Sequence, residues 1–529
     1  MLVLHAHLPY VRHPEQARFL EEDWLFEAIT ETYIPILMML ENVSRHGIRH
    51  VMTLSFSPPL TEMLSDQMLI SRYLGHLDRL ISVAEYEVTA RQGTPLFESA
   101  VMYRDQFRHC RTLVRDVWSG NILNAFRRLD EQGVIELMTC AGTHPVLPLV
   151  SEESNIRAHL ELSQRNFHKH FGRAARGLWM PECAYREETR DQPALDTHFA
   201  EKGFGYTFIE THGIMYGDPR PAYGVYRPVY GPGGTAFFGR DIETSHQVWS
   251  RDQGYPGDPL YREFYRDLGY DGDFAVVKNA LHDDGVRRNI GIKYFRITSG
   301  KIDLGAKEPY TPGPAKEKAA EHAGNFMFNR QKQAEYLTGV LGIAPLIVAM
   351  YDAELFGHWW FEGPMFLEYL FLKMHYDQEN MKPITPSLYL DQNPEQQILK
   401  PATSTWGAGG YFDTWVNGET DWIYRHIHTA ERRMKELAER FPNAEGVTRR
   451  ALNQAGRELV LMQSSDWPFL ITTGTATPYA VRRLKEHIHN FTRLYTESLS
   501  GRVDEKNLAW LEEKDHIFAE EMDYRIFHE

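Results

Sequence analysis

Short apolar runs that end in polar or acidic residues recur along the first two thirds of the chain, with helical patterns between them. Such runs, rich in large and β-branched side chains, are typical of strands buried on both faces of a parallel sheet. Their alternation with helices predicts an α/β architecture with polar groups gathered along one rim. The runs lie at residues 2–4, 50–56, 134–139, 177–181, 204–209, 235–239 and 346–351.

Two stretches depart from this alternation. Residues 60–129 are helical and charged throughout, which is long for one crossover and predicts a helical insertion. After residue 400, apolar side chains recur at spacings of three and four, for example at Ile423, Ile427 and Ala430, which predicts amphipathic helices. We therefore expect a catalytic domain over residues 1–399 and an all-helical domain over 400–529 that contributes to the substrate cleft. A second, loop-rich insertion is expected near 183–240.

Composition and charge limit the classes of partner and the cellular compartment that we expect. The net charge of −15 argues against a nucleic-acid partner and gives no reason to expect an anionic membrane. The chain has three scattered cysteines, no signal peptide and no apolar run of membrane-spanning length, so we expect a cytoplasmic protein, acting as a monomer. Aromatic residues make up 12% of the chain, and their faces suit the C–H faces of sugars.

Two carboxylates stand at predicted strand ends. Asp352 follows the apolar run at 346–351, and Glu182 follows the run at 177–181. Carboxyl ends of parallel strands are where α/β enzymes place their chemistry. Breaking a glycosidic bond needs one carboxylate to attack or direct water and a second to protonate the leaving oxygen. Nearby aromatic residues, which would wall a sugar site, are Trp179, Tyr185, Trp359 and Trp360.

Histidines near the strand ends leave a second chemistry open. His5 and His7 lie two apart, so on a strand they point the same way. A metal-dependent barrel hydrolase would use His5, His7, His144 and Asp352 as ligands. Alternatively, His5 and His7 hydrogen-bond a polar substrate or a neighbouring carboxylate. His7 and His144 are expected substrate contacts.

Five segments together resemble the ordered motifs of glycoside hydrolase family 57, and within it the 1,4-α-glucan branching enzymes. They are HAHLPY at 5–10, GTHPVLPL at 142–149, WMPECAY at 179–185, YDAELFGHWWFEGP at 351–364 and SSDWPF at 464–469. The segments at 239–258 and 406–415 support the resemblance, which covers nearly the whole chain.

The resemblance implies an incomplete (β/α)7 barrel, a retaining mechanism, and no essential metal or other cofactor. It assigns the nucleophile to Glu182 and the acid/base to Asp352. It implies substrate contacts at Arg240, Gly257, Trp406 and Asp466, and a gating role for Tyr230, which the sequence places near the tip of a Gly- and Pro-rich loop. Trp360 in the aromatic wall and Trp415 at the domain junction are further expected contacts.

The sequence therefore predicts an enzyme that cuts an α-1,4-glucan and transfers the segment to a 6-hydroxyl. Three alternatives stay open. They are 4-α-glucanotransfer or amylase-type hydrolysis with the same carboxylates, the metal-dependent hydrolase, and a protein that binds glucan without turnover.

Overall fold

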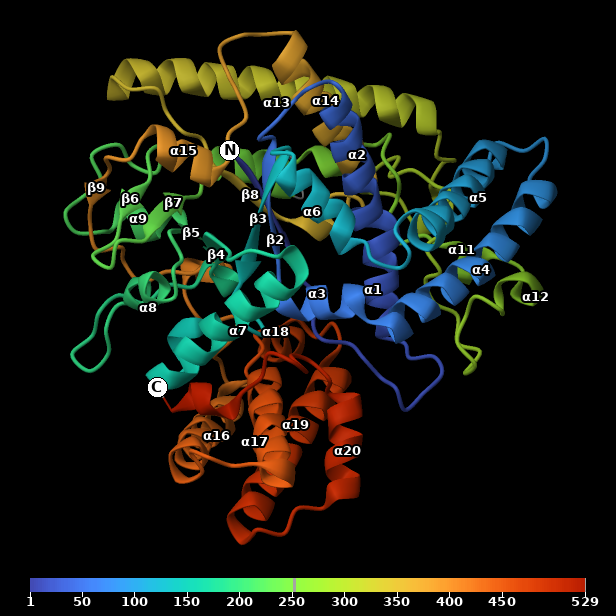
Figure 1. Cartoon of the computed structure of the whole chain (residues 1–529). Helices are drawn as coiled ribbons and strands as arrows, with labels where there is room; N and C mark the ends of the chain where they lie inside the picture. The colour runs from blue at the N-terminus through green and yellow to red at the C-terminus, as the bar shows by residue number, and fades with distance from the viewer. Residues whose placement is uncertain (251–253, 529) are drawn as a thin grey trace.

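A nine-stranded sheet forms the centre of the molecule (Figure 1). The computed structural model describes residues 1–250 and 254–528. Seven neighbouring strands are parallel, as the sequence predicts, and the eighth runs antiparallel to its neighbour. In sheet order the strands are β8 (Ala349–Asp352), β1 (Leu2–Ala6), β2 (Met52–Phe56), β3 (Ile135–Cys140), β4 (Gly177–Trp179), β5 (Tyr206–Ile209), β7 (Ala236–Gly239), β6 (Val229–Tyr230) and β9 (Gln397–Ile398).

The register of the parallel strands aligns their carboxyl ends. His5 of β1 pairs with Asp352 of β8 on one side, and Ala6 pairs with Phe56 of β2 on the other. Further along the sheet, Cys140 of β3 pairs with Trp179 of β4. The residues that follow these strands therefore meet at one rim of the sheet.

The strands are apolar because both faces of the sheet are covered. Side chains on the concave face, among them Val3, Met138 and Met350, form one buried cluster. The opposite face packs on helices in a second and larger cluster. Those helices include α2 (Ile34–Arg45), α7 (Glu153–Phe171), α13 (Pro312–Leu341) and α14 (Gly363–Tyr376). The predicted α/β fold, an incomplete barrel, is confirmed.

The long helical stretch after β2 is also confirmed. It consists of α3 (Pro58–Ser65), α4 (Gln67–Ala90), α5 (Phe97–Thr112) and α6 (Leu123–Glu131). Figure 1 shows α4 and α5 side by side, projecting to the right of the sheet, and the two helices pack on each other. Within the described residues, no helix combines the length and the apolar character needed to cross a membrane.

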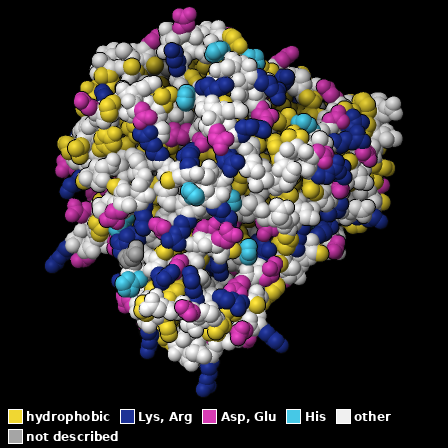
Figure 2. Space-filling view, in the orientation of Figure 1, with side chains coloured by type: hydrophobic (Ala, Val, Ile, Leu, Met, Phe, Trp, Pro, Cys, Tyr) yellow, Lys and Arg dark blue, Asp and Glu magenta, His cyan; other side chains and the backbone are white. Residues whose placement is uncertain are grey.

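The chain after residue 420 is helical. It contains α16 (Asp421–Arg440), α17 (Gly446–Met462), α18 (Asp466–Thr473), α19 (Thr477–Ser500) and α20 (Glu505–Lys514). In Figure 1 these helices lie below the sheet, at the end toward which β1 runs from the N-terminus. Figure 2 shows acidic and basic side chains interspersed over the visible surface of both parts. The exact domain limits stay a prediction.

Candidate active site

Glu182 is held just beyond β4 by an unusual backbone. It lies in the short turn Pro181–Cys183 with φ of 62° and ψ of 19°, in the left-handed region that non-glycine residues seldom adopt. Strain of this kind persists where the surrounding structure fixes it, and it gathers at functional sites. The Glu182 side chain is 15% exposed, so it reaches the rim while remaining largely enclosed.

Two donors face the Glu182 carboxylate. The indole N–H of Trp406 donates to Oε2 at 2.8 Å, and the Ser465 hydroxyl donates to Oε1 at 3.0 Å. Asp352, the last residue of β8, differs, because in the described part of the chain its carboxylate accepts no hydrogen bond. This asymmetry favours a negative charge on Glu182 and a proton on Asp352.

Electrostatics place the two carboxylates in one site. Burial raises the pKa of Glu182 to about 7, and the negative charge of Asp352 adds to that rise. Burial also raises the pKa of Asp352 to about 6, while the positive charges of His7 and Arg240 oppose the rise. Taken separately, these pKa values would protonate Glu182 before Asp352, but the value for Glu182 includes the charge of an ionised Asp352. Because Glu182 alone has two donors, we assign the one proton that the pair holds near neutral pH to Asp352, whose protonation then lowers the pKa of Glu182.

A chain of hydrogen bonds leads away from Glu182 into the barrel. His144 Nδ1 lies 2.7 Å from Ser465 Oγ, His144 Nε2 lies 3.0 Å from His5 Nε2, and His5 Nδ1 lies 3.1 Å from Ser55 Oγ. Because Ser465 gives its proton to Glu182, His144 must donate from Nδ1, His5 must donate from Nε2, and Ser55 must donate to His5. An ionised Glu182 therefore fixes both imidazole tautomers.

His7 serves a second carboxylate. Its Nε2 lies 3.1 Å from Asp466 Oδ1, and its Nδ1 lies 2.8 Å from Ser57 Oγ. Asp466 raises the pKa of His7 against the opposing effect of burial. His7 also stacks on His144 with ring centroids 3.8 Å apart. Of the two uses expected for His7, the hydrogen bond to a neighbouring carboxylate is the one that the structure forms.

The residues expected to contact substrate are partly gathered here. Arg240 follows β7 and donates to Glu210 at 3.0 Å, with its guanidinium 5.6 Å from the ring centroid of Trp406. Trp406 and Asp466 are half-buried beside Glu182 and His7. Gly257 is exposed at the end of the short turn Tyr255–Gly257. Their roles in binding glucan stay predictions.

Several expected substrate contacts are corrected by burial. Trp360 and Trp415 are each 1% exposed, so neither offers a face to a sugar. Trp360 packs against three aromatic rings, those of Tyr261, Phe356 and Phe366. Trp415 packs in a cluster with Val146 and Ala184. His144 is 2% exposed, and both its ring nitrogens are already engaged.

Tyr230 does not lie in the loop where the sequence placed it. It belongs to β6, which pairs with β7 and β9, and its partner Ala236 is the first residue of β7. Because Glu182 and Asp352 follow the carboxyl ends of their strands, Tyr230 lies toward the opposite rim of the sheet. Its predicted gating role is therefore not supported by its position.

The sequence interpretation missed three residues that shape the site. Ser465 and Glu354 occur there only within the segments at 464–469 and 351–364, and Tyr33 occurs in none of the segments. Tyr33 donates to Glu354 Oε1 at 2.5 Å, and the His7 backbone N–H donates to the same oxygen at 3.2 Å. Burial raises the pKa of Glu354 to about 7. The acidic residue two positions after Asp352 was the available signal.

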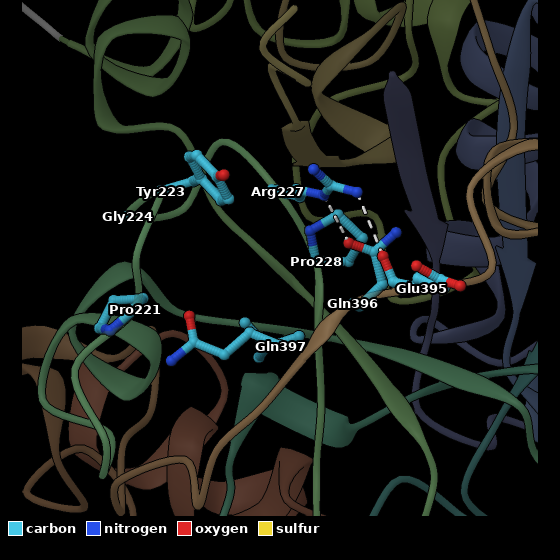
Figure 3. A pocket seen from close by; sticks show the side chains of 9 residues that line it. Pro221, Tyr223, Gly224, Arg227, Pro228, Glu395, Gln396 and Gln397 are labelled. Atoms are coloured by element: carbon cyan, nitrogen blue, oxygen red, sulfur yellow. Dashed lines mark hydrogen bonds between the residues drawn. The ribbon is translucent and has the colours of Figure 1, made fainter. Parts of the chain in front are cut away.

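A pocket of about 230 Å³ lies elsewhere, at the edge of the sheet near β6 and β9 (Figure 3). Its polar groups are largely paired with each other, because Arg227 donates to Gln396 at 2.8 Å and Gln397 accepts from the backbone of Ala222 at 2.8 Å. None of the residues around Glu182 and Asp352 lines this pocket. This pocket is thus separate from the carboxyl rim of the sheet, where the sequence predicts the chemistry.

Comparison with known proteins adds independent findings. Residues 1–296 match the model of glycosyl hydrolase family 57, and residues 426–527 match the C-terminal model of 1,4-alpha-glucan branching enzymes. A 1,4-alpha-glucan branching enzyme of Thermococcus kodakarensis is 36% identical, over 98% of this chain and 76% of its own length.

Two solved structures extend over the whole chain. The alpha-amylase AmyC from Thermotoga maritima is 43% identical with a TM-score of 0.93, covering 100% of this chain and 98% of its own. The branching enzyme from Pyrococcus horikoshii is 35% identical with a TM-score of 0.88, covering 100% of this chain and 96% of its own.

Proposed function

The chain belongs to glycosyl hydrolase family 57, and on that premise we propose that it is a 1,4-α-glucan branching enzyme. It cleaves an α-1,4-glucan and transfers the released segment to a 6-hydroxyl, forming an α-1,6 branch. The similarity to branching enzymes over nearly the full chain and the C-terminal match at 426–527 support this reaction. The observation that carries the chemistry is the asymmetric pair of carboxylates, Glu182 with two donors and Asp352 with none.

In the first step, Glu182 attacks the anomeric carbon while Asp352 protonates the departing glycosidic oxygen. The bond from Glu182 to the sugar forms as the old glycosidic bond breaks, and the leaving chain keeps the proton. The raised pKa of Asp352, about 6, supports its role as the acid. A retaining mechanism requires the two carboxyl groups to lie about 5–5.5 Å apart.

In the second step, Asp352 accepts a proton from the attacking hydroxyl, and Glu182 leaves as the restored carboxylate. The Trp406 and Ser465 donors stabilise that departing charge. If the hydroxyl belongs to another glucan, a branch forms, and if it belongs to water, hydrolysis results. The acceptor is thus chosen by how well the site excludes water while it holds a second chain.

Hydrolysis of α-1,4-glucan is the second candidate. It is favoured by the 43% identity and TM-score of 0.93 to the alpha-amylase AmyC, both higher than for the Pyrococcus horikoshii branching enzyme. The position of Tyr230 away from the carboxyl rim adds weight to it, because the residue expected to restrict water does not lie there. Both candidates use the same carboxylates.

Proton NMR of the product separates the two candidates. Incubation with amylose is expected to produce new α-1,6 anomeric signals with few new reducing ends. Reducing ends that rise without α-1,6 signals would establish hydrolysis instead. Glu182→Gln and Asp352→Asn should each lower turnover by about 10²–10⁴-fold. Near-normal activity in either variant would refute the catalytic assignments.

We propose further that the protein acts as a monomer in the cytoplasm. Its three cysteines, all free and buried, support a protein of a reducing compartment. Size-exclusion chromatography with light scattering tests the monomer, for which a mass near 61.4 kDa is expected.

A further inference from the structure

Three side chains behind the nucleophile converge on one point. His5, Cys140 and His144 each offer a ligand atom, and these atoms lie within 4.8 Å of one another. They come from the end of β1, the end of β3 and the loop that follows β3. All three are buried, with exposed fractions of 0–2%. This set differs from the metal ligands that the sequence suggested, because His7 turns to Asp466 and Cys140 takes part.

The two imidazoles are already oriented as ligands. Their Nε2 atoms face each other at 3.0 Å, while their Nδ1 atoms are held by Ser55 and Ser465. Histidines that bind metals characteristically have the second ring nitrogen held by a hydrogen-bond partner, which sets the ring orientation. Trp179 stacks on His5 with ring centroids 4.7 Å apart and further limits its rotation.

We infer that His5, Cys140 and His144 form a binding site for one soft divalent cation, such as Zn²⁺ or Cd²⁺, and that its occupation inhibits the enzyme. Two imidazoles and a thiolate bind such soft cations in preference to Mg²⁺ or Ca²⁺. On binding, the thiol proton of Cys140 leaves to solvent, and the proton on His5 Nε2 moves to Nδ1, where Ser55 Oγ accepts it. The cation is not a participant in glucan chemistry.

The two imidazole nitrogens need little adjustment. Tetrahedral zinc with bonds of about 2.0–2.1 Å to nitrogen separates two nitrogen ligands by about 3.3 Å. The present separation of the two Nε2 atoms is 3.0 Å, so an opening of a few tenths of an ångström suffices.

A second group of ligand-type residues, Glu458, His487 and Asp515, is less suited to a cation. There Arg483 already donates to Asp515 at 2.7 Å and supplies the positive charge.

Occupation of the site acts on the nucleophile through two hydrogen bonds. His144 contacts Ser465, and Ser465 contacts Glu182 Oε1. A divalent charge on His144 Nε2 strengthens donation from Nδ1 to Ser465, and thus from Ser465 to Glu182. A carboxylate stabilised in this way is a poorer nucleophile in the first step, which we expect to slow, although it is a better leaving group in the second. The inhibition rests on one part of the proposed function, the attack of Glu182 on the sugar. That step is common to branching and hydrolysis.

The test is a titration of the full chain with Cd²⁺. Binding is monitored by the near-ultraviolet absorption of the cadmium–thiolate bond until that absorption no longer rises. We expect one Cd²⁺ per chain and a parallel fall in the rate at which iodine staining of amylose is lost. Cys140→Ser should weaken both effects by at least about tenfold, because it removes the soft ligand. Cys110→Ser is the matched control, since Cys110 is equally buried but lies on α5. Mg²⁺ should have no effect.

An absent absorption band, a band that persists in Cys140→Ser, or a band lost in Cys110→Ser would overturn the assignment. So would full occupation with an unchanged rate. Cys140→Ala provides a second variant if the serine form fails to fold. Because the absorption does not depend on turnover, failure of this site leaves the test of the two carboxylates unaffected.

Discussion

Replacing Trp406 by Phe isolates one hydrogen bond to the nucleophile. The indole N–H donates to Glu182 Oε2 at 2.8 Å, and Phe keeps an aromatic ring while it removes that donor. The contacts of the ring with Trp179, at a centroid separation of 5.2 Å, and with Arg240, at 5.6 Å, are of a kind that Phe also makes. The substitution therefore tests the charge on Glu182 with little change in packing.

The expected change in the pKa of Glu182 follows from the loss of one hydrogen bond to its negative charge. A hydrogen bond to an ionised group contributes about 1.5–3 kcal/mol, and we take the lower end because Trp406 is half-buried. At about 1.4 kcal/mol per pKa unit, the pKa of Glu182 should rise by about one unit. This pKa is about 7 beside an ionised Asp352 and is lower once Asp352 carries the proton, so Glu182 sets the acidic limb. Loss of a donor to the anion raises the pKa of an acid further, so less Glu182 is ionised at any pH near neutral.

The assay is the pH profile of kcat/KM on amylose, followed by iodine staining. In Trp406→Phe, the acidic limb should move to higher pH by about one unit, and the rate below that limb should fall about tenfold. Trp422→Phe is the matched control, because its indole donates to the backbone of Glu419 at 3.0 Å, on α16. An acidic limb that stays in place, with KM alone altered, would show that Trp406 binds substrate without tuning Glu182.

Three further outcomes are expected. Ser465→Ala removes the other donor to Glu182 and should also move the acidic limb to higher pH, whereas an unmoved limb would contradict the hydrogen-bond chain. Trp360→Ala should lower the free energy of unfolding in urea by about 3–5 kcal/mol because the residue is core, whereas Trp359→Ala, 54% exposed, should change it little; equal losses would refute this distinction. Tyr230→Phe should leave the NMR ratio of branches to reducing ends unchanged, and a shift toward hydrolysis would restore its gating role.

The strands and their chemistry were predictable because the signal is local. An apolar run that stops at Asp352 or shortly before Glu182 encodes a buried strand and a polar end within a few residues. The parallel arrangement then follows from the helices between the runs, and it brings the strand ends to one rim. The rim was thus predictable without knowledge of any contact between distant segments.

The environment of those carboxylates was not predictable from local patterns. Ser465 and Glu182 are 283 positions apart, so their contact depends on how the helical part docks on the barrel. Burial of Trp360 and Trp415 likewise depends on neighbours from other elements, since an indole suits a core as well as a sugar face. Tyr230 belongs to a strand of two residues, which is too short to show any periodicity.

The contact of Ser465 with Glu182 also has a consequence for the time at which activity arises during synthesis. The seven neighbouring parallel strands and both catalytic candidates are complete by residue 352. Ser465, which donates to Glu182, and Asp466, which pairs with His7, come much later in the chain. A chain still on the ribosome can therefore contain both carboxylates before it contains the hydrogen-bond partners that orient Glu182 and His7. Partly synthesised chains that lack Ser465 and Asp466 are therefore expected to be inactive on glucan.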